Sequence, residues 1–322
     1  MDNQKRCIPG LPLPLSGIFF GTAMPPVMTD GPDAGALLDS VLLNGVNAFD
    51  CARSYGLAEN ALGRWIKERG VRDQVAILSK CGDIRAGRVE VNRRVIREQL
   101  AKSLEALQTD CIDLYLMHRD DPTTPVEEFI ETLNEARRDG MIRLFGVSNW
   151  TCERIAAANR YAEDKGLTGF SVSSPNFGLA RQMQDLWGGG CVTLSGPENE
   201  AARAWYRANQ MPVIAYSSLG RGFFSGRFKA YDYETARQIL DPYAQRGYLY
   251  EENMARLARA EKLAEKYGVT VPEIAMRYVF GSGMNLFAVV STASPDRLRM
   301  NLRAAAQPLS PQDAAYLEGA EA

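Results

Sequence analysis

Short apolar runs alternate along the chain with longer segments in which apolar positions recur about every 3.6 residues. The short runs have the length and composition of buried strands, and the longer segments have the spacing of amphipathic helices. The predicted strands are Ser16–Gly21, Val46–Asp50, Val75–Lys80, Ile112–His118, Ile142–Ser148, Phe170–Ser174, Val213–Ser217 and Leu286–Val290. Among the helical segments, one apolar face carries Val95, Leu100, Leu104 and Leu107. This alternation predicts repeated strand–helix units around a parallel sheet.

Eight such strands are the number that closes a (β/α)8, or TIM, barrel. The 322 residues would also fit two domains of roughly 150 residues each. No long polar or low-complexity linker interrupts the alternation, however, so we expect a single α/β barrel domain over residues 1–322, with its active site at the carboxyl ends of the strands. The longest interval, residues 218–285, is predicted to be a loop insertion with two helical runs on that side.

The rival α/β architecture is the doubly wound dinucleotide-binding fold. It needs the pattern G-x-G-x-x-G directly after the first strand. The early glycines Gly17, Gly21 and Gly31 do not have this spacing, and the later glycines 220, 222 and 226 do not have it either. The glycine pattern therefore favours the barrel.

Composition and charge narrow the class of protein. With 46% hydrophobic and 24% charged residues the chain reads as globular. Its formal net charge of −2 gives no general attraction to nucleic acid or to an anionic membrane. No apolar window reaches the roughly 20 residues that span a bilayer, and Pro9, Pro12 and Pro14 interrupt the one stretch that resembles a signal peptide. Six scattered cysteines without a CxxC pair predict reduced thiols and a cytoplasmic location.

Titratable residues stand where three of the predicted strands end. Asp50 and Lys80 close the second and third strands, and His118, which is the only histidine, closes the fourth. Tyr55 follows on the loop after Asp50. A lone histidine is most often structural, and an Asp–Lys pair is often only a buried ion pair. Their common place at the strand ends of a barrel favours a catalytic site instead.

A series of short motifs extends this site over almost the whole chain. In order they are Asp50 with Tyr55-Gly56, Glu59-Asn60-x-Leu62-Gly63, Ser79-Lys80, Asp113-Leu114-x-x-x-His118, Gly146-Val147-Ser148-Asn149, Tyr216-Ser217-x-Leu219-Gly220-x-Gly222, and Ser291 to Asn301. Each motif is weak alone, but together and in this order they resemble the aldo-keto reductase family.

The resemblance implies carbonyl reduction, with Tyr55 as the general acid that protonates the carbonyl oxygen as hydride reaches the carbon. An ordinary tyrosine has a pKa of about 10. Lys80 would therefore stabilise the developing phenolate, and Asp50 would hold the ammonium in place. His118 would hydrogen-bond to the substrate carbonyl or share in the proton relay.

The resemblance also implies a nicotinamide cofactor, because no side chain can donate hydride. Ser148 and Asn149 would bind the carboxamide, and Tyr216 would stack on the nicotinamide ring. Where the family usually has a glutamine on the sixth strand, this chain has serines, and Ser174 is expected to substitute for it.

Two segments are expected to hold the rest of the cofactor. The glycine-containing loop with Ser217, Leu219, Gly220 and Arg221 would approach the pyrophosphate. The segment after the last strand would bind the adenosine part through Ser291, Thr292, Ala293, Ser294, Arg297 and Asn301. Ser294 and Pro295 look like the start of a helix, which favours phosphate. In the family an Arg at the place of Arg297 recognises the 2′-phosphate, so NADP(H) is favoured; NAD(H) stays open because Ser291 stands where many members have Lys.

The substrate is expected to be a small aldehyde or ketone, with a sugar or sugar-derived carbonyl slightly favoured. Candidate contacts are Met24, Trp150, Trp187 and Phe223 with Phe224, and the glycine-rich loop of residues 180–196 would fold over the substrate. The sequence does not indicate an oligomeric state.

Three alternatives accompany this interpretation. A metal-dependent hydrolase would need several histidines, and this chain has one, so no metal site is expected. A non-catalytic, cofactor-binding regulatory protein on the same fold stays open, although the intact set of four catalytic residues favours an enzyme. Cys51 and Cys81 could form a redox switch, but small buried thiols are the favoured interpretation.

Overall fold

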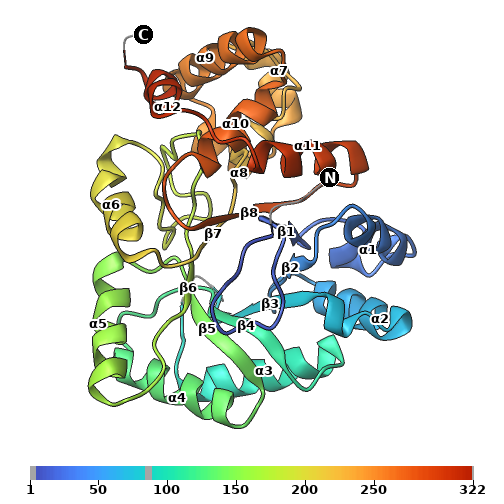
Figure 1. The fold of residues 1–322 in the computed structure, drawn as a ribbon, viewed down its shortest axis with the longest axis vertical. Coiled ribbons are helices and arrows are strands. Elements are labelled where there is room, and N and C mark those ends of the chain that lie inside the picture. The colour runs from blue at the N-terminus through green and yellow to red at the C-terminus, as the bar shows by residue number, and fades with distance from the viewer. Residues whose placement is uncertain (1–4, 84–88, 321–322) are drawn as a thin grey trace. The chain divides into compact units, whose positions relative to one another are not determined.

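The computed structural model of the protein describes residues 5–83 and 89–320. Within these residues the strands are β1 (Ile18–Gly21), β2 (Ala48–Asp50), β3 (Ala76–Cys81), β4 (Ile112–Met117), β5 (Ile142–Ser148), β6 (Val172–Ser174), β7 (Val213–Ala215) and β8 (Leu286–Val290). They follow one another in chain order in a closed barrel (Figure 1). The predicted (β/α)8 fold is confirmed, and both ends of each strand lie within two residues of the predicted bounds.

Helices separate the strands along the chain. They are α1 (Ala34–Leu43), α2 (Ala58–Arg69), α3 (Arg93–Leu107), α4 (Val126–Arg138), α5 (Cys152–Asp164), α6 (Glu200–Asn209), α7 (Tyr233–Ile239), α8 (Pro242–Tyr248), α9 (Glu251–Tyr267), α10 (Val271–Phe280), α11 (Pro295–Ala305) and α12 (Pro311–Glu318). The apolar face predicted on α3 is buried, as its spacing requires.

The chain forms two compact units. The N-terminal unit comprises residues 4–174 and 291–295, and the C-terminal unit comprises residues 175–290 and 296–322. Each unit is described by itself below. The expectation of a single domain over the whole chain stays a prediction.

Parallel strands from β1 to β6 organise the N-terminal unit. The longest pairing joins β4 and β5, from Ile112 opposite Ile142 to Met117 opposite Val147. Every residue of β3 and β4 is buried. Strands buried on both faces need a near-continuous apolar sequence, which explains why short apolar runs rather than alternation mark them.

A close helix–helix contact in the N-terminal unit requires a glycine. A Cβ built on Gly63 of α2 would lie 2.5 Å from the backbone carbonyl of Leu107, at the end of α3. No side chain fits at that separation. The glycine of the Leu62-Gly63 motif therefore sets how closely α2 approaches α3.

The insertion of residues 218–285 in the C-terminal unit contains more helix than predicted. Two helical runs were expected, corresponding to α9 and α10, but the short helices α7 and α8 precede them. The side chains of Asp232 and Asp241 cap these two helices by accepting backbone N–H bonds from Thr235 and Ala244. Helices of seven residues are too short to show a periodic pattern, so the sequence analysis missed them.

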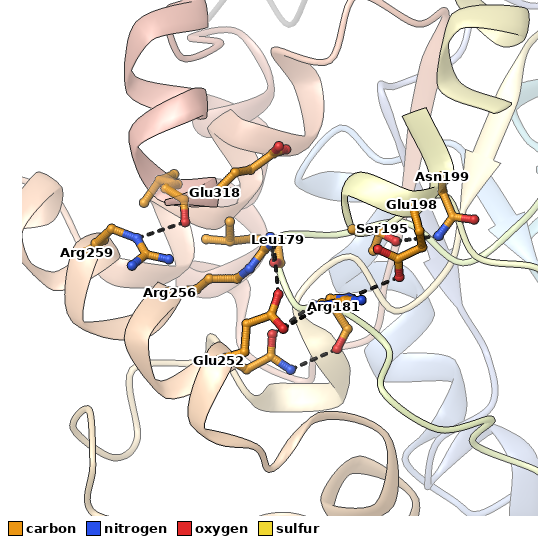
Figure 2. Close-up of polar contacts among 12 residues, drawn as sticks. Leu179, Arg181, Ser195, Glu198, Asn199, Glu252, Arg256, Arg259 and Glu318 are labelled. Carbon is orange, nitrogen blue, oxygen red and sulfur yellow. Dashed lines mark hydrogen bonds and ion pairs between the residues drawn. The ribbon is translucent and has the colours of Figure 1, made fainter. Parts of the chain in front are cut away.

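An arginine network fixes the start of the predicted substrate loop to α9 (Figure 2). Arg256 has only 1% of its side chain exposed, and its Nη1 donates to the carbonyl of Leu179 at 3.1 Å. Glu252 lies 3.4 Å from Nη2 of Arg256 and accepts a 2.6 Å bond from Arg181. Glu252 thus pairs with both guanidinium groups and ties residues 179–181 to the helix, while Arg181 also pairs with Glu198 at 3.0 Å.

Candidate active site

Four predicted catalytic side chains come together in the N-terminal unit. Nζ of Lys80 lies 2.5 Å from Oδ1 of Asp50, 2.9 Å from the carbonyl of Cys51 and 3.4 Å from the hydroxyl of Tyr55. The ring of Tyr55 lies edge-on to that of His118, with 5.8 Å between centroids and 80° between planes. The ammonium of Lys80 is therefore held between the carboxylate and the phenol, in contact with both.

Burial and charge set the protonation states of this cluster. Burial raises the pKa of Tyr55 to about 12, and the neighbouring Lys80 opposes that rise without cancelling it. Burial alone would lower the pKa of Lys80, but the Asp50 and Tyr55 charges outweigh it and leave that pKa raised. At neutral pH the cluster therefore holds an ammonium beside a protonated phenol.

His118 is fixed through its backbone and is neutral. Its N–H donates to the carbonyl of Cys81 at 2.6 Å, and its carbonyl accepts a 3.1 Å bond from Asn149. Burial, and then the charge of Lys80, lower the pKa of its imidazole to about 3, while Asp83 acts in the opposite direction. One ring nitrogen therefore carries a proton at neutral pH and the other carries a lone pair.

The sequence analysis did not predict three residues that lie near His118. The hydroxyl of Ser54 and Oδ2 of Asp83 each lie 3.5 Å from its Nδ1. Arg119 is within 3.6 Å of the other oxygen of Asp83. Asp83 stands three residues after Lys80, beyond the end of the same strand, and that position is the one signal in the sequence that could have identified it.

The predicted carboxamide contacts form a short hydrogen-bond chain at the ends of β5 and β6. Asn149 donates to the hydroxyl of Ser148 at 3.0 Å, and Ser148 donates to the backbone carbonyl of Ser174 at 2.7 Å. Asn149 has a φ of 61°, a left-handed conformation that Asn tolerates better than most residues. The chain brings these three residues together and joins them to His118.

The first part of the predicted adenosine segment belongs to the same unit. Ser291 donates its hydroxyl to the carbonyl of Gly21 at 2.8 Å, and the hydroxyl of Thr292 accepts the backbone N–H of Ser294 at 3.1 Å. Ala293 is exposed between them. Helix α11 begins at Pro295, directly after Ser294, which confirms the predicted helix start.

In the C-terminal unit Trp187 packs against Tyr216. Their ring centroids lie 5.9 Å apart with 58° between planes. Asp185 shapes the loop that carries Trp187, because its carboxylate accepts the backbone N–H groups of Trp187 and Cys191, each at 2.8 Å. Burial alone would raise the pKa of Asp185, but these bonds leave it below its ordinary value. Trp187, a predicted substrate contact, thus packs against Tyr216, the residue predicted to stack on the nicotinamide ring.

Arg221 extends this aromatic group. Its guanidinium lies 5.8 Å from the ring of Trp187 and 5.6 Å from that of Tyr243, and it pairs with Asp241 at 2.9 Å. Tyr243 belongs to α8, and Asp241 caps the start of that helix. The sequence analysis did not assign either residue to the site. Arg221 therefore ties the glycine-containing loop to α8.

The glycine-containing loop has an unusual backbone. Ser217, Gly220, Arg221 and Gly222 all have positive φ, at 56°, 58°, 51° and 96°. A Cβ on Gly220 would lie 3.0 Å from the Cβ atoms of Ala180 and Phe223, so no larger residue fits there without strain. The N–H of Gly220 already donates to the carbonyl of Ser217 at 2.7 Å. Among the four loop residues predicted to approach the pyrophosphate, Leu219 is therefore a better backbone contact than Gly220.

The remaining adenosine candidates lie on α11. Arg297 is exposed, whereas Asn301 is buried. The side-chain oxygen of Asn301 is buried without a hydrogen-bond partner among the described residues. A buried amide oxygen in this state suits a ligand N–H donor such as the adenine amino group.

The predicted substrate contacts differ in how much of each side chain is exposed. Met24 and Trp187 are half-buried. Trp150 and Phe223 are each only 1% exposed. Trp150 lies edge-on to Phe129 and Phe170, in a core aromatic cluster. As placed, Trp150 and Phe223 offer almost no surface to a substrate.

The two cysteines that follow the catalytic positions are buried free thiols. Burial raises the pKa of Cys51 and of Cys81 to about 12. Since the thiolate is the reactive form, this favours small buried thiols over a redox switch.

Among residues 5–83 and 89–320, no group of three or more His, Cys, Asp or Glu side chains could hold a metal ion. In the same ranges, no helix has the length and apolar character needed to cross a bilayer.

Comparisons with known proteins identify the family and the fold. Residues 17–322 match the model of the Aldo/keto reductase family. The aldo-keto reductase YhdN of Bacillus subtilis is 30% identical over 277 residues, which cover 82% of this chain and 77% of the relative. The NADP(+) aldo-keto reductase yakc of Schizosaccharomyces pombe is 27% identical, with coverage of 85% and 79%. The solved glycerol dehydrogenase AKR11B4 of Gluconobacter oxydans shares the fold, with a TM-score of 0.74, 23% identity and coverage of 99% and 95%.

Proposed function

We propose a specific reaction for this chain, which belongs to the aldo/keto reductase family: NADPH-dependent reduction of an aldehyde or ketone to an alcohol, with Tyr55 as the proton donor. Membership of the family supports an oxidoreductase that acts on small-molecule carbonyl compounds. The cofactor, the role of Tyr55 and the kind of substrate are our proposal.

One observation carries the proposal. Lys80 is held by Asp50 at 2.5 Å and reaches the hydroxyl of Tyr55 at 3.4 Å. As a proton leaves Tyr55 for a carbonyl oxygen, negative charge develops on the phenolate. An ammonium already in contact stabilises that charge with little reorganisation. Asp50 keeps the ammonium in place, and the raised pKa of Tyr55 keeps the donor protonated before the reaction.

The residues present fit a nicotinamide dinucleotide. The buried, unpartnered amide oxygen of Asn301 suits the adenine amino group, and the exposed Arg297 suits a 2′-phosphate. Ser148 and Asn149 would bind the carboxamide, Tyr216 would stack on the nicotinamide, and Leu219 would contact the pyrophosphate. When bound, the cofactor supplies the hydride.

We favour NADP(H) over NAD(H) because of Arg297, and the relative yakc carries NADP(+) in its name. Ser291 stands where many family members have Lys, and its hydroxyl is engaged with Gly21. Recognition of the 2′-phosphate therefore depends on Arg297 and on the helix start at Ser294. We also propose a cytoplasmic location, because the chain has six cysteines without a CxxC pair and reduced thiols are typical of that compartment.

The test follows NADPH absorbance with a panel of aldehydes, ketones and aldoses for the wild type and Tyr55→Phe. We expect turnover in the wild type and loss of most of it in the variant, with NADPH binding retained. Tyr161→Phe is the matched control, because its hydroxyl donates to Glu131 in an exposed hydrogen bond of α5 and should be dispensable.

Equal turnover by the wild type and Tyr55→Phe would contradict the assignment of the proton donor. Binding of NADPH without turnover across the panel would favour the regulatory interpretation instead.

A further inference from the structure

We propose that Tyr248, the last residue of α8, is a positioning residue that holds the loop of residues 217–222 in the shape that receives the pyrophosphate of the cofactor. The first half of this proposal, the shape of the loop, is a property of the protein alone. The second half, the binding of a pyrophosphate, rests on the function proposed above.

The backbone of this loop is strained at its first residue. Ser217 has a φ of 56°, in the left-handed region that residues with a side chain rarely adopt. Such a conformation persists only where the surrounding structure holds it. The turn that follows is closed by the N–H of Gly220, which donates to the carbonyl of Ser217 at 2.7 Å. A contact that fixes Ser217 therefore also fixes this turn.

Tyr248 provides a contact of this kind. Its hydroxyl is hydrogen-bonded to the side chain of Ser217 and accepts a second bond from Nδ2 of Asn176 at 2.9 Å. Its ring lies against the loop as well, because a Cβ built on Gly220 would come within 3.9 Å of Cδ2 of the ring. One side chain thus contacts both ends of the turn from Ser217 to Gly220.

Tyr248 is itself held in place. It is 1% exposed, and burial raises the pKa of its hydroxyl, so the group stays neutral and can both donate and accept hydrogen bonds. Its backbone carbonyl accepts a 2.9 Å bond from Nδ2 of Asn253, a fully buried residue of α9. The same Nδ2 donates to the carbonyl of Arg181 at 2.8 Å. The hydroxyl therefore reaches Ser217 from a residue that α9 fixes.

The consequence concerns the part of the cofactor that the loop would bind. Backbone N–H groups bind a pyrophosphate only when they point toward it, and their direction depends on the backbone angles of the loop. Without the Tyr248 hydroxyl, Ser217 can relax toward ordinary backbone angles, which redirects the N–H of Leu219. NADPH and NADH carry the same pyrophosphate, so both should lose affinity equally, unlike the effect of a defect in 2′-phosphate recognition.

Hydrogen–deuterium exchange tests the shape of the loop without any cofactor. Tyr248→Phe removes the hydroxyl and keeps the ring. We expect the amides of residues 217–224 to exchange about tenfold faster in this variant than in the wild type, because the bonds that Gly220 and Phe224 donate within the loop open more easily. Equal exchange in both proteins would overturn the proposal, whether or not the protein binds NADPH.

Tyr278→Phe is the matched control. This tyrosine of α10 is 4% exposed, and its hydroxyl donates to Glu318 at the end of α12. Both substitutions remove a buried tyrosine hydroxyl from the same unit, so both should lower stability. Only Tyr248→Phe should change exchange in the loop. Faster exchange of residues 217–224 in both variants would indicate a general loss of stability and would contradict a role specific to Tyr248.

Calorimetric titration with three ligands tests the consequence for the cofactor. We expect Tyr248→Phe to raise the dissociation constants of NADPH and NADH by about tenfold each. Adenosine 2′,5′-bisphosphate, which lacks the pyrophosphate, should bind the variant as tightly as the wild type. In a Ser217→Ala background the change Tyr248→Phe should have little further effect, because the hydroxyl acts through Ser217.

Unchanged affinity for NADPH in Tyr248→Phe, or an equal loss for all three ligands, would overturn the link from Tyr248 to the pyrophosphate while leaving the proposed role of Tyr55 intact. A wild type that binds none of the three ligands would overturn the proposed cofactor and this link together. The exchange experiment decides the role of Tyr248 in the loop in either case.

Discussion

At the scale of single residues, the protonation of Tyr55 differs from the simple expectation. The resemblance implies that Lys80 stabilises the phenolate of Tyr55, which would lower the pKa of the tyrosine. In the structure burial outweighs the lysine and raises the pKa of Tyr55 to about 12. The phenol therefore stays protonated at neutral pH, as the proposed proton donor must be.

A pH profile follows from that value. Because the donor is the protonated form and its pKa is raised, kcat/KM for carbonyl reduction should show no loss from ionisation of Tyr55 between pH 7 and 10. Lys80→Met removes the charge that lowers this pKa, so the variant should also show no falling limb there, at a reduced rate throughout. A wild-type rate that falls with a midpoint near pH 8 would contradict the burial argument.

Some residues of the candidate site could be predicted from the sequence, and others could be identified only in the structure. Asp50, Lys80 and His118 end strands, and the barrel topology of β2, β3 and β4 forces strand ends together. Ser54 and Asp83 lie on loops, where contact with His118 depends on the local backbone path. Trp150 was predicted to contact the substrate, but Phe129 and Phe170, distant in sequence, pack against it and leave it only 1% exposed.

At the scale of elements, strand positions were predictable and short helices were not. A parallel strand buried on both faces shows as an apolar run, which is visible without knowledge of its neighbours. Helices α7 and α8 depend on their aspartate caps and on packing, since a helix of two turns has little stability of its own. Tyr243 and Asp241 therefore appeared beside Arg221 only in the structure.

The contact between α2 and α3 gives a prediction at this scale. Gly63→Ala should reduce the free energy of unfolding by about 1–3 kcal/mol, because the new Cβ would lie 2.5 Å from the Leu107 carbonyl. Alanine's better helix propensity, about 1 kcal/mol, would offset only part of that loss.

Gly35→Ala in α1 is the matched control, since only the tip of Arg69, 3.9 Å away, meets its new Cβ. It should leave stability unchanged or raise it by up to about 1 kcal/mol. Urea unfolding of both variants measures the two effects. If Gly63→Ala were as stable as Gly35→Ala, the closeness of α2 to α3 would not depend on the glycine.

At the scale of the whole molecule, the barrel follows from the alternation of strands and helices, whereas the proposed preference for NADP(H) would depend on a few side chains after β8. Anything that binds only the folded chain raises its unfolding free energy, by about 2.7 kcal/mol at a ligand concentration of 100 Kd. NADPH should therefore raise the melting temperature of the wild type by several degrees. If residues 1–322 are one domain, the melting curve should stay a single transition that shifts as a unit.

Arg297→Ala separates the two cofactors in the same experiment. Loss of a charged hydrogen bond to the 2′-phosphate should weaken the binding of NADPH by about tenfold or more. The rise in melting temperature that NADPH causes should therefore be smaller in the variant. The shift with NADH, which has no 2′-phosphate, should stay as in the wild type. Equal losses for both cofactors would mean that Arg297 acts through the fold of α11, and NADP(H) preference would then need another source.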